Sequence, residues 1–199
     1  ADNADMWIHE AFTTYAESIY AECMYGVDAG PKYIESLKPR VQNKEPIQGY
    51  YGVAKEGSGD MYAKGAVFLH TLRLQIDNDS IWYDILKSMH ERFRHKVTDY
   101  EAILQFFNTK SKMDLSPLFD VYLRYGSIPE LTVTKSISPS KITLTLTSPN
   151  QTAPLRLKVK YKIDGMEKSS YLDNQTALEI PYNYEFKLIE DNYLKYRYK

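Results

Sequence analysis

The spacing of apolar residues changes near residue 127, and this change limits the folds that the chain can adopt. Before that point apolar residues recur every three or four positions, which is typical of amphipathic helices. After it, short segments alternate apolar and polar residues, and the segment from Leu155 to Ile163 does so strictly. Strict alternation is typical of a half-buried antiparallel strand. The spacing therefore predicts a helical part followed by a β part.

The charge balance changes at the same place. The chain carries 14 basic and 18 acidic residues through Ser127, and 11 and 8 after it. We therefore predict two domains, residues 1–127 and 128–199, with an α+β fold in which an α-helical bundle precedes a small antiparallel β-sandwich. The net charge of −1 gives no reason to expect nucleic acid as a partner. No apolar run is long enough to predict a membrane-spanning helix.

Helix boundaries in the first domain follow from capping and breaking residues. Asp5 is the expected cap of the first helix, and Thr98 with Glu101 forms an expected capping box. The glycine-rich segment from Asn43 to Gly59 is predicted to be a loop. The predicted helices span Asp5 to about Cys23, Asp28 to Val41, Asp60 to Ile76, Asp79 to Phe93, Thr98 to Asn108 and Leu115 to Tyr125.

The second domain is predicted to contain seven short strands. Asp164 and Gly165 follow the most regular strand and form a strong signal for a hairpin turn. The predicted strands lie near Leu131–Thr134, Lys141–Leu146, Leu155–Ile163, Ser169–Leu172, Ala177–Ile180, Tyr184–Ile189 and Leu194–Tyr198.

Two places begin like the zinc-binding motif H-E-x-x-H, but neither completes it. After His9 and Glu10, Thr13 stands where the second histidine is required. After His90, the next histidine is His95, five positions on. At roughly 100° per residue these two side chains lie about 140° apart around a helix, so they cannot share one ion. Neither place is predicted to be a metal site.

The first helix also carries Glu10, Thr14 and Glu17 on one face, opposite its apolar residues. Periodicity alone favours a solvated acidic face. The surrounding string Asp-Met-Trp-Ile-His-Glu-Ala-Phe, residues 5–12, resembles the D-x-W-L-x-E-G-F signature of the aminopeptidase N-type gluzincins, a family that includes leukotriene hydrolase. The resemblance implies that Glu10 is the third ligand of a catalytic zinc ion. Ala11 departs from the family's usual glycine, and His9 from its common asparagine.

A second string supports the resemblance. Residues 62–66, Tyr-Ala-Lys-Gly-Ala, resemble the family's Y-x-K-G-A helix, in which the tyrosine hydroxyl stabilises the tetrahedral intermediate. The resemblance assigns this role to Tyr62. A weaker match at residues 114–119 and 129–131 is similar to the family's link from its helical region into a β domain.

In this family an H-E-x-x-H helix precedes the glutamate. Counted back from Glu10, that histidine pair would fall before Ala1, so we expect this chain to be a fragment that lacks two of the three zinc ligands. The resemblance then implies a zinc-dependent aminopeptidase acting on peptides as the parent enzyme, with the fragment inactive by itself.

Two questions stay open at the level of the sequence. Glu17 lies two turns beyond Glu10, and we expect it to accept a hydrogen bond from a zinc-bound histidine, unless it is a solvent-exposed glutamate. The chain as a whole is alternatively a non-catalytic interaction module derived from such an enzyme. In that case the loop with Tyr50 and Tyr51 would be the contact surface.

Overall fold

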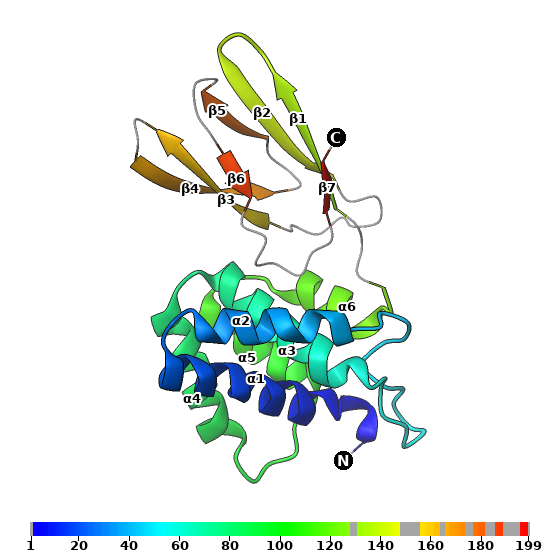
Figure 1. Cartoon of the computed structure of the whole chain (residues 1–199). Coiled ribbons are helices and arrows are strands. Elements are labelled where there is room, and N and C mark those ends of the chain that lie inside the picture. The colour runs from blue at the N-terminus through cyan, green and yellow to red at the C-terminus, as the bar shows by residue number, and fades with distance from the viewer. Residues whose placement is uncertain are drawn as a thin grey trace. The chain divides into compact units, whose positions relative to one another are not determined.

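The computed structural model describes residues 2–127, 131–147, 156–163, 166–173, 177–181, 186–188 and 196–198. The chain divides into two compact units, Ala1–Ser127 and Ile128–Lys199. The first consists of helices and the second of strands, as Figure 1 shows, which confirms the predicted fold class of a helical part followed by a β part. Among the described residues, no helix combines the length and apolar character needed to cross a membrane.

The helical unit begins with a single 3₁₀ turn, η1 (Asn3–Asp5), that leads into α1 (Trp7–Tyr25). Helix α1 buries Trp7, Ala11 and Tyr15 against the rest of the unit. The prediction that Asp5 caps this helix is wrong. Met6 is the N-cap residue, and Asp5 lies buried in the preceding turn because its carboxylate accepts hydrogen bonds from other segments.

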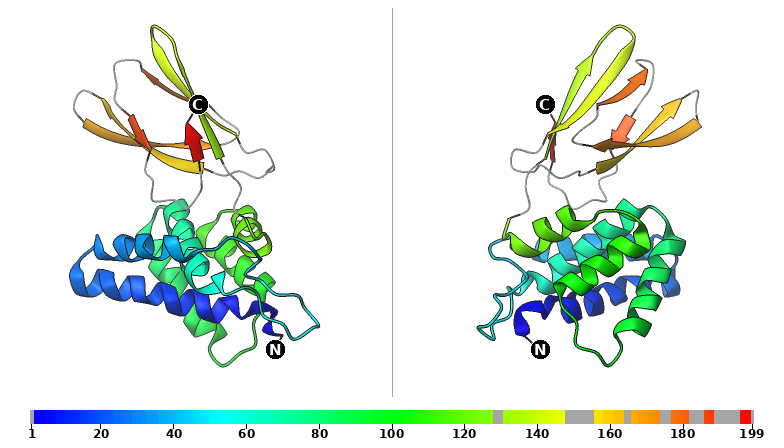
Figure 2. Two further views of the ribbon diagram at one scale, coloured as in Figure 1. Left: turned by 45° about the vertical axis from the view of Figure 1, so that its right-hand side comes forward. Right: turned by 180° about the vertical axis from the view of Figure 1, so that it is seen from behind.

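Helix α2 (Ala29–Leu37) folds back along α1, as the left view of Figure 2 shows. Gly26 permits the turn between them, because its φ of 97° lies in the left-handed region that glycine tolerates. The predicted end of this helix at Val41 is wrong. The α-helix ends at Leu37, and the 3₁₀ turn η2 (Lys38–Arg40) follows it. The α-helix does not continue because Pro39 lacks the N–H that an α-helical turn requires.

Helix α3 (Asp60–Ile76) is the centre of the unit and has the predicted bounds. It packs against α1, α2, α4 and α6. All of its residues are buried except Tyr62 and Leu74. The first residues of the preceding loop are bonded to the first residue of α3. The Asp60 carboxylate accepts hydrogen bonds from the backbone N–H groups of Gln42 and Asn43 at 2.9 and 2.7 Å.

Three further helices complete this unit: α4 (Asp79–Phe93), α5 (Tyr100–Ser111) and α6 (Ser116–Arg124). The bounds of α4 agree with the prediction, and Asn78 caps it by accepting a hydrogen bond from the N–H of Ile81. The predicted capping box of Thr98 and Glu101 is wrong. Asp99 is the N-cap of α5, and its carboxylate accepts a hydrogen bond from the N–H of Ala102.

The described residues of the β unit form two sheets. In the four-stranded sheet β5 (Leu178–Pro181), β2 (Lys141–Thr147), β1 (Leu131–Ile137) and β7 (Tyr196–Tyr198) lie in that order. In the three-stranded sheet the order is β4 (Met166–Asp173), β3 (Arg156–Ile163) and β6 (Phe186–Leu188). Each of the seven strands overlaps a predicted one.

Most strand pairs are antiparallel, as predicted, but β1 pairs with β7 in parallel. Strand β4 contacts β2 and β5 of the other sheet. That the two sheets form a β-sandwich nevertheless stays a prediction. The predicted turn at Asp164 and Gly165 lies outside the described residues, although β3 and β4 pair from Ile163 and Met166 outward, as a hairpin would.

Candidate functional site

Glu10 lies in the first turn of α1 and is half-buried. The first turn of a helix favours a carboxylate, because the unpaired N–H groups there carry partial positive charge. Thr14 lies one turn further on and is also half-buried, and its hydroxyl donates to the Glu10 carbonyl at 2.7 Å, so that it bonds to the backbone of Glu10. The Thr14 hydroxyl therefore does not donate to the Glu10 carboxylate.

Tyr62 is the exposed aromatic residue of the otherwise buried helix α3, with 46% of its surface accessible. The negative charge of the Glu10 carboxylate raises the pKa of Tyr62, and desolvation raises it further. A negative charge nearby disfavours the phenolate. The structure thus brings together the two side chains that the sequence motifs singled out, although they lie in different helices.

The close approach of α1 and α3 explains this arrangement. A Cβ atom added at Gly65 would lie only 2.6 Å from the Cβ of Ala11 and 3.1 Å from its Cα. Gly65 is therefore required for the helices to cross at this distance. Ala11 directly follows Glu10, and Gly65 lies one turn beyond Tyr62 on the same side of its helix. The crossing point is next to both functional side chains.

Glu17 is exposed, and its carboxylate accepts a hydrogen bond from the hydroxyl of Tyr33 in α2. Burial and the Glu17 carboxylate together raise the pKa of Tyr33 to about 12. Within the described residues Glu17 therefore links α1 to α2. Its predicted role beside a zinc-bound histidine stays a prediction.

Lys64 is a residue of the Y-x-K-G-A string whose role the sequence did not indicate. Its side chain is fully buried, and its ammonium group donates to the backbone carbonyls of Tyr125 and Gly126 at 2.8 and 3.0 Å. Burial lowers its pKa to about 8. Lys64 thus ties the chain just after α6 to the central helix, next to Tyr62. Sequence reasoning missed it because its partners are 61 and 62 residues away.

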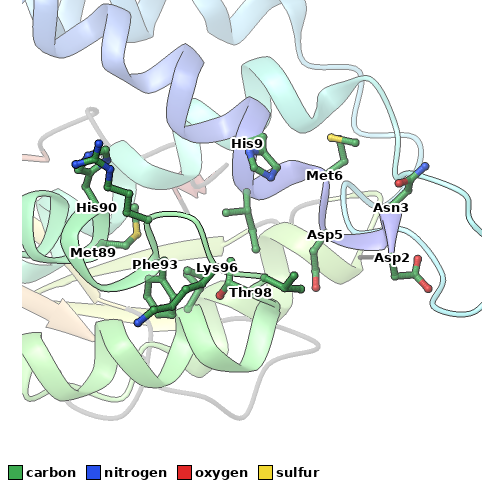
Figure 3. Close-up of a pocket in the computed structure, with 14 residues that line it drawn as sticks. Asp2, Asn3, Asp5, Met6, His9, Met89, His90, Phe93, Lys96 and Thr98 are labelled. Atoms are coloured by element: carbon green, nitrogen blue, oxygen red, sulfur yellow. The ribbon is translucent and has the colours of Figure 1, made fainter.

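The first histidines of the two incomplete H-E-x-x-H strings line one pocket. His9 of α1 and His90 of α4 both line it, as Figure 3 shows, together with Asp5, Met6 and Phe93. Glu10 and Tyr62 are not among its lining residues. In the part of the chain that the structure describes, no group of three or more histidine, cysteine or acidic residues could hold a metal ion.

Solved structures that resemble this chain include an aminopeptidase and zinc metallopeptidases. Aminopeptidase A from Legionella pneumophila, in complex with aspartic acid, matches all of this chain and 24% of its own, with a TM-score of 0.70 and 16% identity. The chain therefore has the fold of a part of that aminopeptidase. No protein-family model matches the sequence, and no curated protein does either.

Two further structures match 64% of the chain. An M1 zinc metallopeptidase variant from Deinococcus radiodurans, bound to a Tyr-Ser-Ala substrate, has a TM-score of 0.54 and 24% identity. A two-domain M1 zinc metallopeptidase variant bound to L-tryptophan has a TM-score of 0.54 and 25% identity. This chain spans 24–29% of the length of these proteins. At these identities the likeness establishes the fold.

Proposed function

We propose that this chain is part of a zinc aminopeptidase of the M1 type, in which Glu10 is one of three zinc ligands and Tyr62 stabilises the tetrahedral intermediate. The observation that carries the proposal is the juxtaposition of Glu10 and Tyr62. The pair joins two motifs that are separate in the sequence, and it lies beside the close contact of Ala11 in α1 with Gly65 in α3. A solvated acidic face would not require an exposed tyrosine on the central helix beside it.

The described residues do not form a zinc site by themselves. Catalytic zinc takes three protein ligands and keeps one position for water, and this chain offers one candidate carboxylate. The other two ligands would come from the intact protein. A bound zinc ion would supply an activated water and polarise the scissile carbonyl.

Tyr62 is suited to the role of a hydrogen-bond donor. A tyrosine hydroxyl is protonated at neutral pH, and the Glu10 charge raises the pKa of Tyr62 further, while the exposure of Tyr62 leaves the hydroxyl accessible to a substrate. As water attacks a peptide carbonyl, negative charge develops on the carbonyl oxygen, and a positioned hydroxyl stabilises that charge. Tyr62 would thus contribute more to the transition state than to substrate binding.

Glu17 is part of the same proposal as a hydrogen-bond acceptor for a zinc-bound histidine. A carboxylate can accept several hydrogen bonds, so its bond from Tyr33 leaves capacity for another donor. The proposed substrates are peptides with a free amino terminus, and this chain alone is expected to be inactive.

The test is hydrolysis of aminoacyl arylamides by the intact protein, with zinc content measured in parallel. Tyr62→Phe should retain zinc and lose about 100- to 1000-fold in kcat, because one donor to the oxyanion is removed. Glu10→Gln should lose both zinc and activity. Glu22→Gln is the matched control, since it changes a carboxylate at the far end of the same helix and should retain both properties. Wild-type turnover in Tyr62→Phe would contradict the proposal.

A further inference from the structure

The pocket of Figure 3 has the size and composition of a small-molecule site. It lies between the first turn of α1, the last turn of α4 and the connection from α4 to α5. Its volume is about 360 Å³, and protein pockets for small ligands usually enclose about 300–1,000 Å³. Apolar side chains form much of its wall, namely Met6, Ile8, Met89, Phe93, Val97 and Ile103. The pocket therefore offers an apolar surface to a ligand.

Positive charge lines the pocket on the α4 side. Arg94 and Lys96 come directly after α4, and neither forms an ion pair with an acidic residue in the part of the chain that the structure describes. The Nε–H of Arg94 donates to Nε2 of His95 at 3.2 Å, so its two terminal nitrogen atoms remain available to a ligand. Figure 3 shows Phe93 and Lys96 on the same side of the pocket, where an apolar ring and a cation both face a ligand.

Hydrogen bonds fix the backbone that carries these two cations. The N–H of Arg94 donates to the His90 carbonyl at 3.0 Å. The N–H of Lys96 donates to the Phe93 carbonyl at 3.0 Å. His95, between them, has a φ of 58° in the left-handed region, which closes the turn after the helix. A preformed turn reduces the conformational entropy that is lost when a ligand binds.

The two acidic residues that line the pocket, Asp2 and Asp5, already have hydrogen-bond donors. The Asp2 carboxylate accepts from two backbone N–H groups, at 3.0 and 2.6 Å. The Asp5 carboxylate accepts from four uncharged donors in other segments and in the start of α1. Their negative charge still opposes a multiply charged anion. The pocket is therefore suited to a single negative charge, placed at Arg94 and Lys96.

A buried hydroxyl group adds a further polar contact. Thr98 lines the pocket, and its Oγ1 is buried without a hydrogen-bond partner among the described residues. Buried hydroxyl groups in proteins normally have a partner, because an unpaired one costs free energy. An oxygen atom of a ligand in the pocket would supply that partner.

We propose that this pocket binds a small monocarboxylic acid with an apolar side group. The side group would pack on the apolar wall, and the carboxylate would accept charge-assisted hydrogen bonds from Arg94 and Lys96. Burial of the apolar group would supply affinity, and the two cations would select the acid over its neutral analogues. The inference goes beyond the proposed function and does not depend on zinc, because neither Glu10 nor Tyr62 lines the pocket.

Methionine methyl groups make occupation of the pocket measurable. Met6 and Met89 line it, whereas the other four methionines do not. The full chain, with carbon-13 in its methionine methyl groups, is titrated with N-acetyl-L-phenylalanine and followed by NMR. Met6→Leu and Met89→Leu assign the two signals. Both signals should shift until they saturate, while those of the exposed Met24 and Met166 should stay unchanged.

Two related compounds separate the charge from the apolar group. The neutral amide of N-acetyl-L-phenylalanine should bind about tenfold more weakly, because it lacks the charge-assisted hydrogen bonds. Phenyl phosphate, which is nearly doubly ionised at neutral pH, should bind no more tightly than the acid. An amide that binds as tightly as the acid, or a phosphate that binds more tightly, overturns the proposed ligand class.

The double variant Arg94→Gln/Lys96→Gln tests where the carboxylate binds. Both side chains are exposed, so the variant should fold, and it should bind the acid and the amide equally. Lys87→Gln is the matched control, because it removes an exposed cation of α4 that does not line the pocket. It should keep the wild-type preference for the acid. If the double variant keeps that preference too, the proposal is wrong.

The same titration of the intact protein distinguishes a ligand site from a contact surface. The proposal predicts the same shifts of Met6 and Met89 there. If the acid binds this chain but not the intact protein, another part of the protein covers the pocket and the proposal fails. Simultaneous shifts of Met24 and Met166 would show general adsorption and would also exclude it. The proposed function fails separately, on unchanged turnover of Tyr62→Phe.

Discussion

At the scale of single residues, Ala11 and Gly65 determine how closely Glu10 can approach Tyr62. The methyl group of Ala11 occupies the space that glycine leaves free in α3. The departure from the glycine of the D-x-W-L-x-E-G-F signature is therefore accommodated, because one small residue and one glycine still meet at the crossing. The distance between Glu10 and Tyr62 therefore depends on the combined volume of the side chains at positions 11 and 65.

Gly65→Ala should consequently force the helices apart. Its new methyl group would lie 2.6 Å from the Cβ of Ala11, and overpacking of this kind costs about 1–3 kcal/mol. Urea unfolding should show this loss, and the pKa of Tyr62 should fall as Glu10 moves away. Gly59→Ala is the control, because a Cβ at Gly59 meets no atom within 4 Å.

The double variant Ala11→Gly/Gly65→Ala tests the reason for this loss. It moves the methyl group from α1 to α3 and leaves a closest contact of 3.1 Å with the Cα of residue 11. It should recover the pKa of Tyr62 and part of the stability, less about 1 kcal/mol for the glycine in α1. If the double variant recovers neither the pKa of Tyr62 nor the stability lost in Gly65→Ala, the distance between the crossing helices does not determine these two properties.

At the scale of elements, α3 holds charged and titratable groups inside the helical unit. Arg73 pairs with Glu22 of α1 and with Asp79 of α4, each at 2.7 Å. His70 lies nearby and is 4% exposed. Burial, followed by the charges of Arg73 and Lys38, lowers the pKa of His70 to about 4. The imidazole is therefore neutral in the folded chain at pH values where it would be protonated after unfolding.

His70 should make the stability of the helical unit depend on pH. Between its ordinary pKa of about 6.5 and its folded value of about 4, the unfolded chain binds the additional proton, so the free energy of unfolding decreases as the pH falls. The expected loss from pH 7 to pH 5 is about 2 kcal/mol, as measured by urea unfolding. His70→Gln should flatten this dependence, and an equal slope in both proteins would exclude His70 as its source.

Local patterns predicted the elements better than the contacts between them. The bounds of α3 and α4 could be predicted because long apolar periods end at recognisable capping residues. The Thr98 capping box failed because an equally good cap, Asp99, stands beside it. The parallel pairing of β1 with β7 joins the two ends of the β unit, and no local signal indicates such a long-range contact.

The candidate site shows the same limit. Periodicity placed Glu10 on a polar face and left Tyr62 as one of 18 tyrosines, so only the resemblance to a known family singled them out. Asp5 and Lys64 stand in the same two motifs, but their roles depend on partners up to 95 residues away. A sequence motif thus identified the segments, and the packing of the helices was needed to find what each residue does.

At the scale of the complete chain, the polypeptide is a small part of what the proposed activity requires. It spans 24–29% of the length of the solved peptidases described above, and it offers one candidate zinc ligand among the residues described. Its contribution would be a rigid pair of helices that presents a carboxylate and a hydroxyl side by side. The rest of the zinc site would have to face the crossing of α1 and α3.

A crystal structure of the intact protein, with anomalous diffraction recorded at the zinc absorption edge, would test the proposed site directly. The predicted result is a zinc peak about 2.0–2.2 Å from a carboxylate oxygen of Glu10, with the Tyr62 hydroxyl facing the open coordination position. A peak that Glu10 does not contact, or a Glu10 side chain turned away from Tyr62 into solvent, would contradict it.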